Sequence, residues 1–170
     1  MSFLTDNKYS LKQVEVFDNF YHGLWDIEDI VRPTGRTWQK KGIDAMLLLR
    51  SGKTIKIDEK SRRLNYADIL LEEIANTNKD TVGWAFDESK ESDYIAYKLP
   101  PKKIYLLPAD LLRRTCHKFR DTWADPENEL AQYPMDAPNR TYTTRNFAVD
   151  VDYLFKCMVE CCKFLPNNSN

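Results

Sequence analysis

The sequence has no long hydrophobic run and no low-complexity tract, and both absences limit the class of protein. None of its apolar stretches is long enough to cross a membrane as a helix, so we expect no membrane segment. Residues 1–10 lack the basic segment followed by an apolar stretch that marks a secretory signal, which favours a cytoplasmic protein. Hydrophobic residues make up 42% of the 170 residues, and no internal repeat is present. This composition and length predict one globular domain over residues 1–170.

Cysteine is scarce, and its spacing does not match a structural metal site. The four cysteines, Cys116, Cys157, Cys161 and Cys162, lie in segments with helical patterns, and no Cys-x-x-Cys pair is present. We expect no disulfide framework in a chain of this size and compartment. A zinc site built from Cys116, His117, Cys157 and Cys161 is an alternative, but small buried thiols are favoured.

Net charge is also nearly absent. A formal charge of −1 argues against a protein that coats nucleic acid through bulk charge. Basic residues are concentrated in one stretch, however: Lys40, Lys41, Lys53, Lys56, Lys60, Arg62 and Arg63. Such a basic rim predicts contact with a phosphodiester backbone, while ordinary solvated hairpin charges are the alternative for each residue.

Acidic residues occur within this basic stretch at two informative positions. An apolar strand is expected to begin at Asp44, a tight turn to follow at residues 51–53, and a second strand to end at Asp58-Glu59-Lys60. The two-residue period of a strand places Asp58 and Lys60 on one face. An antiparallel hairpin brings Asp44 beside them. Two carboxylates and a lysine together are suited to holding a divalent cation against a phosphate.

These residues resemble the catalytic core of the PD-(D/E)XK nuclease superfamily. Its members have an acid that begins one strand, followed one hairpin later by an acid, any residue and a lysine. Asp44 and Asp58-Glu59-Lys60 match this order, and Gln39 stands shortly before Asp44 as in phage and bacterial members. The proline of the superfamily's Pro-Asp pair is absent, because Ile43 precedes the first acid. The resemblance covers residues 10–97.

The resemblance implies an α/β fold of restriction-endonuclease type, with a central mixed β-sheet flanked by helices and a core order of αβββαβ. It also implies hydrolysis of phosphodiester bonds in nucleic acid, with DNA favoured and Mg²⁺ or Mn²⁺ as cofactor. Asp44, Asp58 and the main-chain carbonyl of Glu59 would be metal ligands. Lys60 would position or deprotonate the attacking water, or stabilise charge on the phosphate. Gln39 would orient the water or contact the substrate.

The same resemblance implies further residues for the site. Lys40, Lys41, Arg62 and Arg63 are the candidates for contacting nucleic acid. An early helix, expected over residues 11–22 and ended by Gly23, would supply Glu15 or Asp18 as another metal ligand. We favour Asp18, because it lies between apolar positions; a solvent-facing role is the alternative. The short apolar pattern of residues 68–76 allows either a helix or a strand. The resemblance favours a third strand, which would add Glu72 or Glu73 as a metal ligand or as a hydrogen-bond partner of basic residues.

The remaining pattern completes the expected α/β fold. Residues 25–37 are predicted to be a loop that allows one helical turn, and residues 124–139 to be irregular, because prolines and glycine interrupt them. Strands are expected at 93–98, 103–107 and 140–150, and helices at 109–123 and 151–165.

Three other functions remain compatible with the sequence. The charges around Asp44 and Asp58 could be a surface ion-pair cluster without chemistry. The chain could be a catalytically inactive nucleic-acid-binding or assembly module on the same fold, or a protein-interaction factor such as an inhibitor. If it cuts duplex DNA, a homodimer is possible, because one-site enzymes often act on two strands as two copies.

Overall fold

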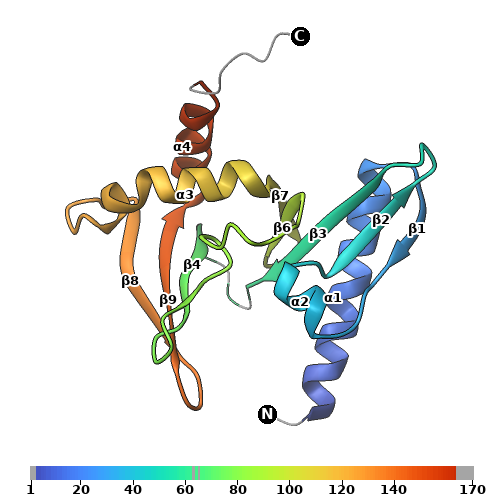
Figure 1. The fold of residues 1–170 in the computed structure, drawn as a ribbon, viewed down its shortest axis with the longest axis horizontal. Coiled ribbons are helices and arrows are strands. Elements are labelled where there is room, and N and C mark those ends of the chain that lie inside the picture. Colours follow the sequence, from blue (N-terminus) through green and yellow to red (C-terminus); the bar gives the residue numbers. More distant parts are fainter. Residues whose placement is uncertain (1–2, 63, 65, 164–170) are drawn as a thin grey trace. The chain divides into compact units, whose positions relative to one another are not determined.

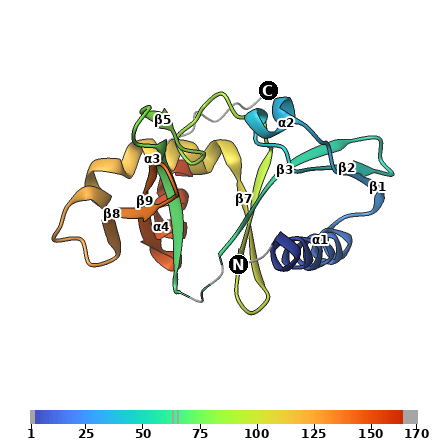
Figure 2. The same cartoon turned by 90° about the horizontal axis from the view of Figure 1, so that it is seen from below.

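The computed structural model describes residues 3–62, 64 and 66–163, with side chains from Gln13 on, and the chain divides into two compact units (Figures 1 and 2). Unit 1 comprises Met1–Asn65 and Glu91–Leu106, and unit 2 comprises Tyr66–Lys90 and Leu107–Asn170. Each unit has its own sheet and helices. The single domain over residues 1–170 stays a prediction.

Unit 1 is built on a five-stranded mixed sheet with the strand order β1-β2-β3-β6-β7. Its elements are α1 (Phe3–Leu24), β1 (Ile27–Val31), α2 (Arg36–Lys41), β2 (Ala45–Leu49), β3 (Thr54–Ser61), β6 (Tyr94–Leu99) and β7 (Lys103–Pro108). Strands β1, β2 and β3 are antiparallel neighbours, whereas β3 and β6 are parallel. The predicted α/β class with a mixed sheet is confirmed. The restriction-endonuclease-like strand order is not.

The hairpin of β2 and β3 forms where the sequence predicts it. Ala45 pairs with Ile57 and Leu47 with Ile55, so the apolar side chains of both strands lie on one face. The turn depends on Gly52, whose φ of 84° is accessible to glycine at little cost. The Gly52 N–H donates to the Leu49 carbonyl at 2.8 Å, and the Leu49 N–H donates to the Lys53 carbonyl at 2.9 Å.

Helix α1 covers the apolar face of this hairpin (Figure 2). Phe17 and Tyr21 are 2% and 0% exposed and belong to one core cluster with Ala45, Leu47 and Ile57. The helix continues two residues beyond the predicted end at His22. A glycine in a helix costs about 1 kcal/mol, and the bond from the Trp25 N–H to the Tyr21 carbonyl at 3.0 Å extends the last turn past it.

The prediction of an irregular segment at residues 25–37 is wrong in part. Ile27–Val31 form the short edge strand β1, and Arg36–Lys41 form helix α2. A register shift between Ile27 and Asp29 breaks the alternation of apolar and charged residues, so the two-residue period is hidden in the sequence. The strand forms because the edge of β2 offers backbone hydrogen bonds and the core accepts Ile27, which is 7% exposed.

Unit 2 contains a four-stranded sheet with the order β5-β4-β9-β8, in which all neighbours are antiparallel. Its elements are β4 (Asp68–Asn76), β5 (Thr81–Val82), α3 (Ala109–Ala124), β8 (Ala131–Pro138), β9 (Thr143–Asp150) and α4 (Val151–Lys163). Helix α3 and the sheet enclose a core around Leu71, Leu112, Trp123 and Phe147, each fully buried.

Two predictions about unit 2 need correction. Strand β4 does not join β2 and β3 in one sheet, because the free edge of β3 is taken by β6 and β4 pairs with β9 instead. The segment predicted to be irregular at 124–139 contains strand β8. Prolines 134 and 138 are tolerated there because β8 is an edge strand and its register shifts between Gln132 and Met135.

The cysteines lie in the two helices of unit 2 as free thiols. Cys116, Cys157 and Cys161 are buried, as predicted, and burial raises the pKa of the Cys116 thiol. Cys162 is exposed.

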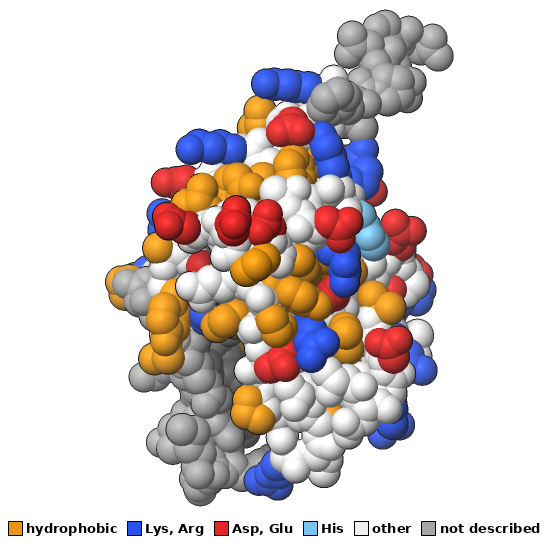
Figure 3. Space-filling model, turned by 90° about the vertical axis from the view of Figure 1, so that its left-hand side faces the viewer, with side chains coloured by type: hydrophobic (Ala, Val, Ile, Leu, Met, Phe, Trp, Pro, Cys, Tyr) orange, Lys and Arg blue, Asp and Glu red, His pale blue; other side chains and the backbone are white. Residues whose placement is uncertain are grey.

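The surface of unit 2 near β8 and α3 carries both charge signs and scattered hydrophobic side chains (Figure 3). The exposed hydrophobic residues of unit 2 include Val82, Leu130, Met135 and Tyr142. Across the described part of the chain, no helix combines the length and apolar character needed to cross a membrane.

Candidate functional site

Asp44 and Asp58 come together at the open end of the β2–β3 hairpin in unit 1. The register places Ala45 opposite Ile57, so the next residues outward, Asp44 and Asp58, share the face opposite to helix α1. The Asp44 N–H donates to the Ile57 carbonyl at 2.9 Å. The Glu59 N–H donates to Asp44 Oδ2 at 2.9 Å, which fixes this carboxylate against the backbone of β3.

Lys60 joins the two acids from the same strand face. Its Nζ donates a hydrogen bond to Asp58 Oδ1. The Asp58 side chain is 2% exposed, whereas 27% of the Lys60 side chain remains accessible. The structure therefore brings together the three side chains that the hairpin pattern places on one face.

Burial makes Asp58 the most perturbed carboxylate of this group. Its pKa is raised from 3.8 to about 6, mainly because the carboxyl is removed from water; Lys60 opposes this rise and nearby Asp44 adds to it. Asp58 is therefore ionised at neutral pH although its surroundings disfavour the charge. Perturbed carboxylates of this kind occur most often at functional sites, where a cation offsets the cost.

The main-chain carbonyl of Glu59 points to the same edge as Asp44. In a strand, the N–H and C=O of one residue leave the chain on the same side, and the Glu59 N–H is directed at the Asp44 carboxylate. Strand β2 begins only at Ala45, so it does not extend far enough to pair with this carbonyl. Glu59 thus offers a third oxygen beside the two aspartates.

This donor set fits a hard divalent cation that keeps part of its water shell. Within residues 3–62, 64 and 66–163, no group of three or more His, Cys, Asp and Glu side chains is arranged to hold a metal ion. The two carboxylates and one carbonyl supply three oxygen donors. Mg²⁺ binds through one or two carboxylates and retains several waters, so a full protein cage is not required.

Asp18 does not join this group. Its Oδ1 accepts a hydrogen bond from Arg32 Nη2 at 2.6 Å, and Arg32 also binds both oxygens of Glu59, at 2.9 and 3.0 Å. The Tyr21 hydroxyl donates to Glu59 Oε1 at 2.9 Å. Because Glu59 faces α1 and Asp58 faces the other way, Asp18 belongs to a half-buried ion network behind the strand.

The sequence pattern missed Arg32 and Tyr21 as members of this network. Burial raises the pKa of Glu59, and the bonds from Arg32 and Tyr21 partly offset this effect. Burial lowers the pKa of Arg32, but its bonds to Glu59 and Asp18 outweigh that and raise the pKa. The available signal was Glu59 itself, since a glutamate facing a helix-covered sheet needs a cationic partner.

Glu72 lies in unit 2, on β4, in a different sheet from Asp58. Its Oε1 accepts from the Trp84 N–H at 3.4 Å. The neighbouring Glu73 is 8% exposed and accepts a hydrogen bond from Arg120 Nε at 2.6 Å. Glu73 is therefore a hydrogen-bond partner of a basic residue, which is one of the two roles expected for Glu72 or Glu73.

The other predicted residues flank Asp44 and Lys60 along the chain. Gln39 is exposed on α2, whose end is capped by Gly42 in the left-handed conformation with φ 65°. Lys40 is exposed and Lys41 half-buried at the end of this helix, and the half-buried Arg62 binds the Lys98 carbonyl through its N–H at 3.0 Å. Arg63 lies outside the described residues.

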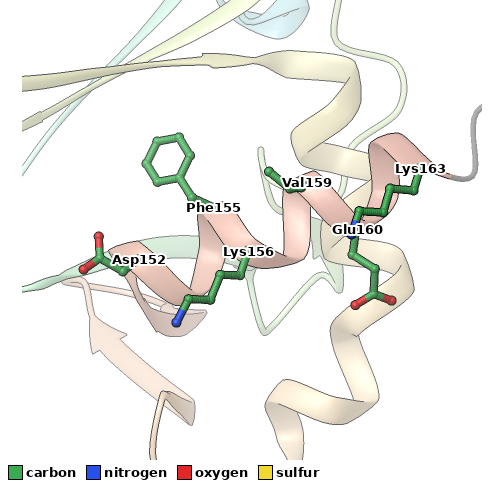
Figure 4. A pocket seen from close by; sticks show the side chains of 6 residues that line it. All are labelled: Asp152, Phe155, Lys156, Val159, Glu160 and Lys163. Atoms are coloured by element: carbon green, nitrogen blue, oxygen red, sulfur yellow. The ribbon is translucent and has the colours of Figure 1, made fainter.

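A groove along α4 in unit 2 is a second candidate site (Figure 4). Its lining residues are Asp152, Phe155, Lys156, Val159, Glu160 and Lys163. All six come from one helix, and Phe155 and Glu160 leave it in different directions. Glu160 pairs with Lys118 at 2.9 Å. This groove gathers no group of convergent polar atoms, so the Asp44–Asp58 edge is the stronger candidate.

The raised pKa of Asp58 predicts a pH-dependent change in protein stability that can be measured without metal. The pKa of Asp58 is about 6 in the folded protein, above the ordinary 3.8, so the folded state binds a proton at this carboxylate more tightly than the unfolded chain does. The protein therefore loses stability as the pH rises from about 4 to about 6. Asp58→Asn removes the titration. In chelator, we expect this variant to be more stable than the wild type by up to about 3 kcal/mol at pH 7, with the difference disappearing near pH 4. Urea unfolding at both pH values measures it; equal stability at pH 7 would contradict the burial argument.

The ion network of Arg32, Asp18 and Glu59 behind β3 leads to a second stability prediction. Arg32→Gln leaves Glu59, whose side chain is 11% exposed, without its cation, so we expect a loss of about 2–4 kcal/mol in the free energy of unfolding at pH 7. The loss should shrink at pH 4, where protonation of Glu59 removes the unpaired charge. Arg50→Gln is the matched control, because its pair with Asp26 is exposed (64% and 81%) and should be worth under about 1 kcal/mol. Equal losses in the two variants would show that the network is not a stabilising unit.

Comparison of the chain with family models, with curated proteins and with solved structures finds no match.

Proposed function

We propose that this protein is a metal-dependent nuclease that hydrolyses phosphodiester bonds of nucleic acid, with DNA as the favoured substrate and Mg²⁺ or Mn²⁺ as cofactor. The observation that supports it most is the strand register that sets Asp44 beside Asp58 with Lys60 on the same face. A surface ion-pair cluster has no need of an acid that is 2% exposed. The resemblance of these residues to the PD-(D/E)XK core points to the same chemistry.

The residues divide the work of phosphodiester hydrolysis. A divalent cation, when bound, neutralises phosphate charge and supplies a nucleophilic water. Asp44 and Asp58 would hold it together with the Glu59 carbonyl. Lys60 would stabilise the charge that develops on the phosphate in the transition state, because its ammonium group lies at Asp58 and remains partly accessible. Gln39, on the adjoining helix, would contact the substrate or its water. A homodimer acting on two strands and a cytoplasmic location are part of this proposal.

A cleavage assay tests the proposal. The full chain is incubated with supercoiled plasmid, single-stranded DNA and single-stranded RNA, in Mg²⁺, in Mn²⁺ and in EDTA. We expect cleavage of at least one substrate with metal and none in EDTA. Absence of cleavage in every arm, together with absence of Mg²⁺ or Mn²⁺ binding by calorimetry, would refute the nuclease function. In that case, DNA affinity without metal would identify a binding module, and its absence would favour a protein-interaction factor.

A further inference from the structure

Two lysines meet one glutamate beside the Asp44–Asp58 edge, all within unit 1. Lys41 ends helix α2 three residues before Asp44, and Lys56 stands on β3 on the same face as Asp58. Glu91 precedes β6. Its Oε1 lies 3.0 Å from Lys41 Nζ, and its Oε2 lies 3.2 Å from Lys41 Nζ and 3.8 Å from Lys56 Nζ.

The main chain fixes this meeting point independently of the side chains. The Glu91 N–H donates to the Lys41 carbonyl at 2.8 Å. The Asp93 N–H donates to the Lys56 carbonyl at 2.8 Å, and the Lys56 N–H donates to Asp93 Oδ2 at 2.7 Å. The segment before β6 is therefore attached to both α2 and β3 without the Glu91 carboxylate, which is free to serve another purpose.

We propose that Lys41 and Lys56 form a subsite for a backbone phosphate of nucleic acid, and that Glu91 occupies this subsite in the free protein as an internal competitor. The inference rests on the proposed function for the identity of the polymer. A phosphodiester carries the same single negative charge as the carboxylate and offers oxygen acceptors to both ammonium groups.

Exposure makes the exchange inexpensive. The side chains of Lys41, Lys56 and Glu91 are 38%, 38% and 44% exposed, so an incoming phosphate reaches the lysines without unfolding any element. Ion pairs of this exposure contribute little to stability, so nucleic acid, which makes several contacts at once, readily replaces this one. The hydrogen bond from Lys41 lowers the pKa of Glu91, so the competitor is charged at neutral pH.

Binding without cleavage tests the subsite. The probe is a fluorescein-labelled duplex DNA of about 20 base pairs, and a labelled single-stranded RNA is tested in parallel. Each probe is titrated with protein in EDTA over a range of salt concentrations. We expect Glu91→Gln to tighten binding by about two- to fivefold, the ratio that corresponds to an exposed ion pair. In this background, Lys41→Gln and Lys56→Gln should each weaken binding and reduce the salt slope by about one on duplex DNA.

Asp26→Asn is the matched control. It removes one carboxylate from unit 1 and from an exposed pair with Arg50, so it changes net charge by the same amount as Glu91→Gln. Equal tightening in both variants, or an unchanged salt slope in both lysine variants, would overturn the subsite. Because no metal is present, the binding result is separate from that of the cleavage assay. Cleavage by the wild type together with unchanged DNA binding in Glu91→Gln would refute this inference alone. Tighter DNA binding in Glu91→Gln, with neither cleavage nor metal binding in the wild type, would refute the nuclease function alone.

Discussion

Asp58→Asn is expected to abolish metal-dependent cleavage and to remove measurable Mg²⁺ binding. Asp58 is the buried member of the pair, and the amide keeps its shape and its ability to accept a hydrogen bond from Lys60. What the variant loses is one of two negative charges, without which the remaining Asp44 and a carbonyl hold a hard cation weakly. We expect cleavage to fall by at least about a thousandfold, since charge stabilisation in the transition state depends on the cation. Calorimetry with Mn²⁺ and a plasmid-nicking assay measure the two effects.

The same variant separates function from folding. Asp58→Asn is predicted to be the more stable protein in chelator at pH 7, so a loss of activity cannot be assigned to unfolding. Asp26→Asn, at an exposed ion pair of unit 1, should bind Mn²⁺ and cleave as the wild type does. Retained cleavage by Asp58→Asn at wild-type rate would place the chemistry elsewhere in the chain.

Lys60→Ala is expected to lose cleavage while keeping metal binding. Removal of one donor that stabilises transition-state charge typically costs about a hundred- to a thousandfold in rate. The metal ligands Asp44 and Asp58 remain in place. Lys60 holds the pKa of Asp58 down, so that pKa should rise in the variant and metal affinity at pH 6 should fall relative to the wild type.

A pH series distinguishes the two consequences of losing Lys60. Raising the pH to 8 ionises Asp58 and should restore Mn²⁺ affinity to near the wild-type value, whereas the cleavage rate should stay low. Arg50→Gln, which removes a cation from an exposed ion pair of the same unit, serves as the control and should keep the wild-type catalytic rate. Full cleavage by Lys60→Ala at pH 8 would remove Lys60 from the transition state and leave it a role in tuning Asp58.

The hairpin and its acid cluster could be predicted from the sequence because they depend on local rules. Alternation assigns Asp58 and Lys60 to one face, and the turn at Gly52 sets the register that brings Asp44 to them. Both rules operate within residues 44–60. The opposite facing of Glu59 follows from the same alternation.

The arrangement of the strands could not be predicted in the same way. The partner of β3 is β6, more than thirty residues later, and the partner of β4 is β9, more than seventy residues later. Every candidate edge offers the same backbone hydrogen bonds, so the choice depends on packing that no short window contains. The expectation that β4 would continue the β2–β3 sheet therefore failed, although the resemblance had favoured a strand over a helix for this segment.

The ion network behind β3 was missed for a related reason. The inward position of Asp18 was predicted from its apolar neighbours, but the cation that it meets, Arg32, follows a strand that the sequence pattern did not show. Asp18 was expected to be a metal ligand, but in the structure its carboxylate binds the guanidinium of Arg32. The network also supports the site. Arg32 binds the Glu59 side chain, and the Glu59 N–H donates a hydrogen bond to the Asp44 carboxylate.

The location of a bound ion tests the central claim most directly. A crystal soaked in Mn²⁺ and measured at the manganese absorption edge should show one anomalous peak between the carboxylates of Asp44 and Asp58, within coordination distance of the Glu59 carbonyl. Soaked crystals of Asp58→Asn should lack it. Side chains of Asp44 and Asp58 that diverge, with no anomalous density between them in the wild type, would contradict the account.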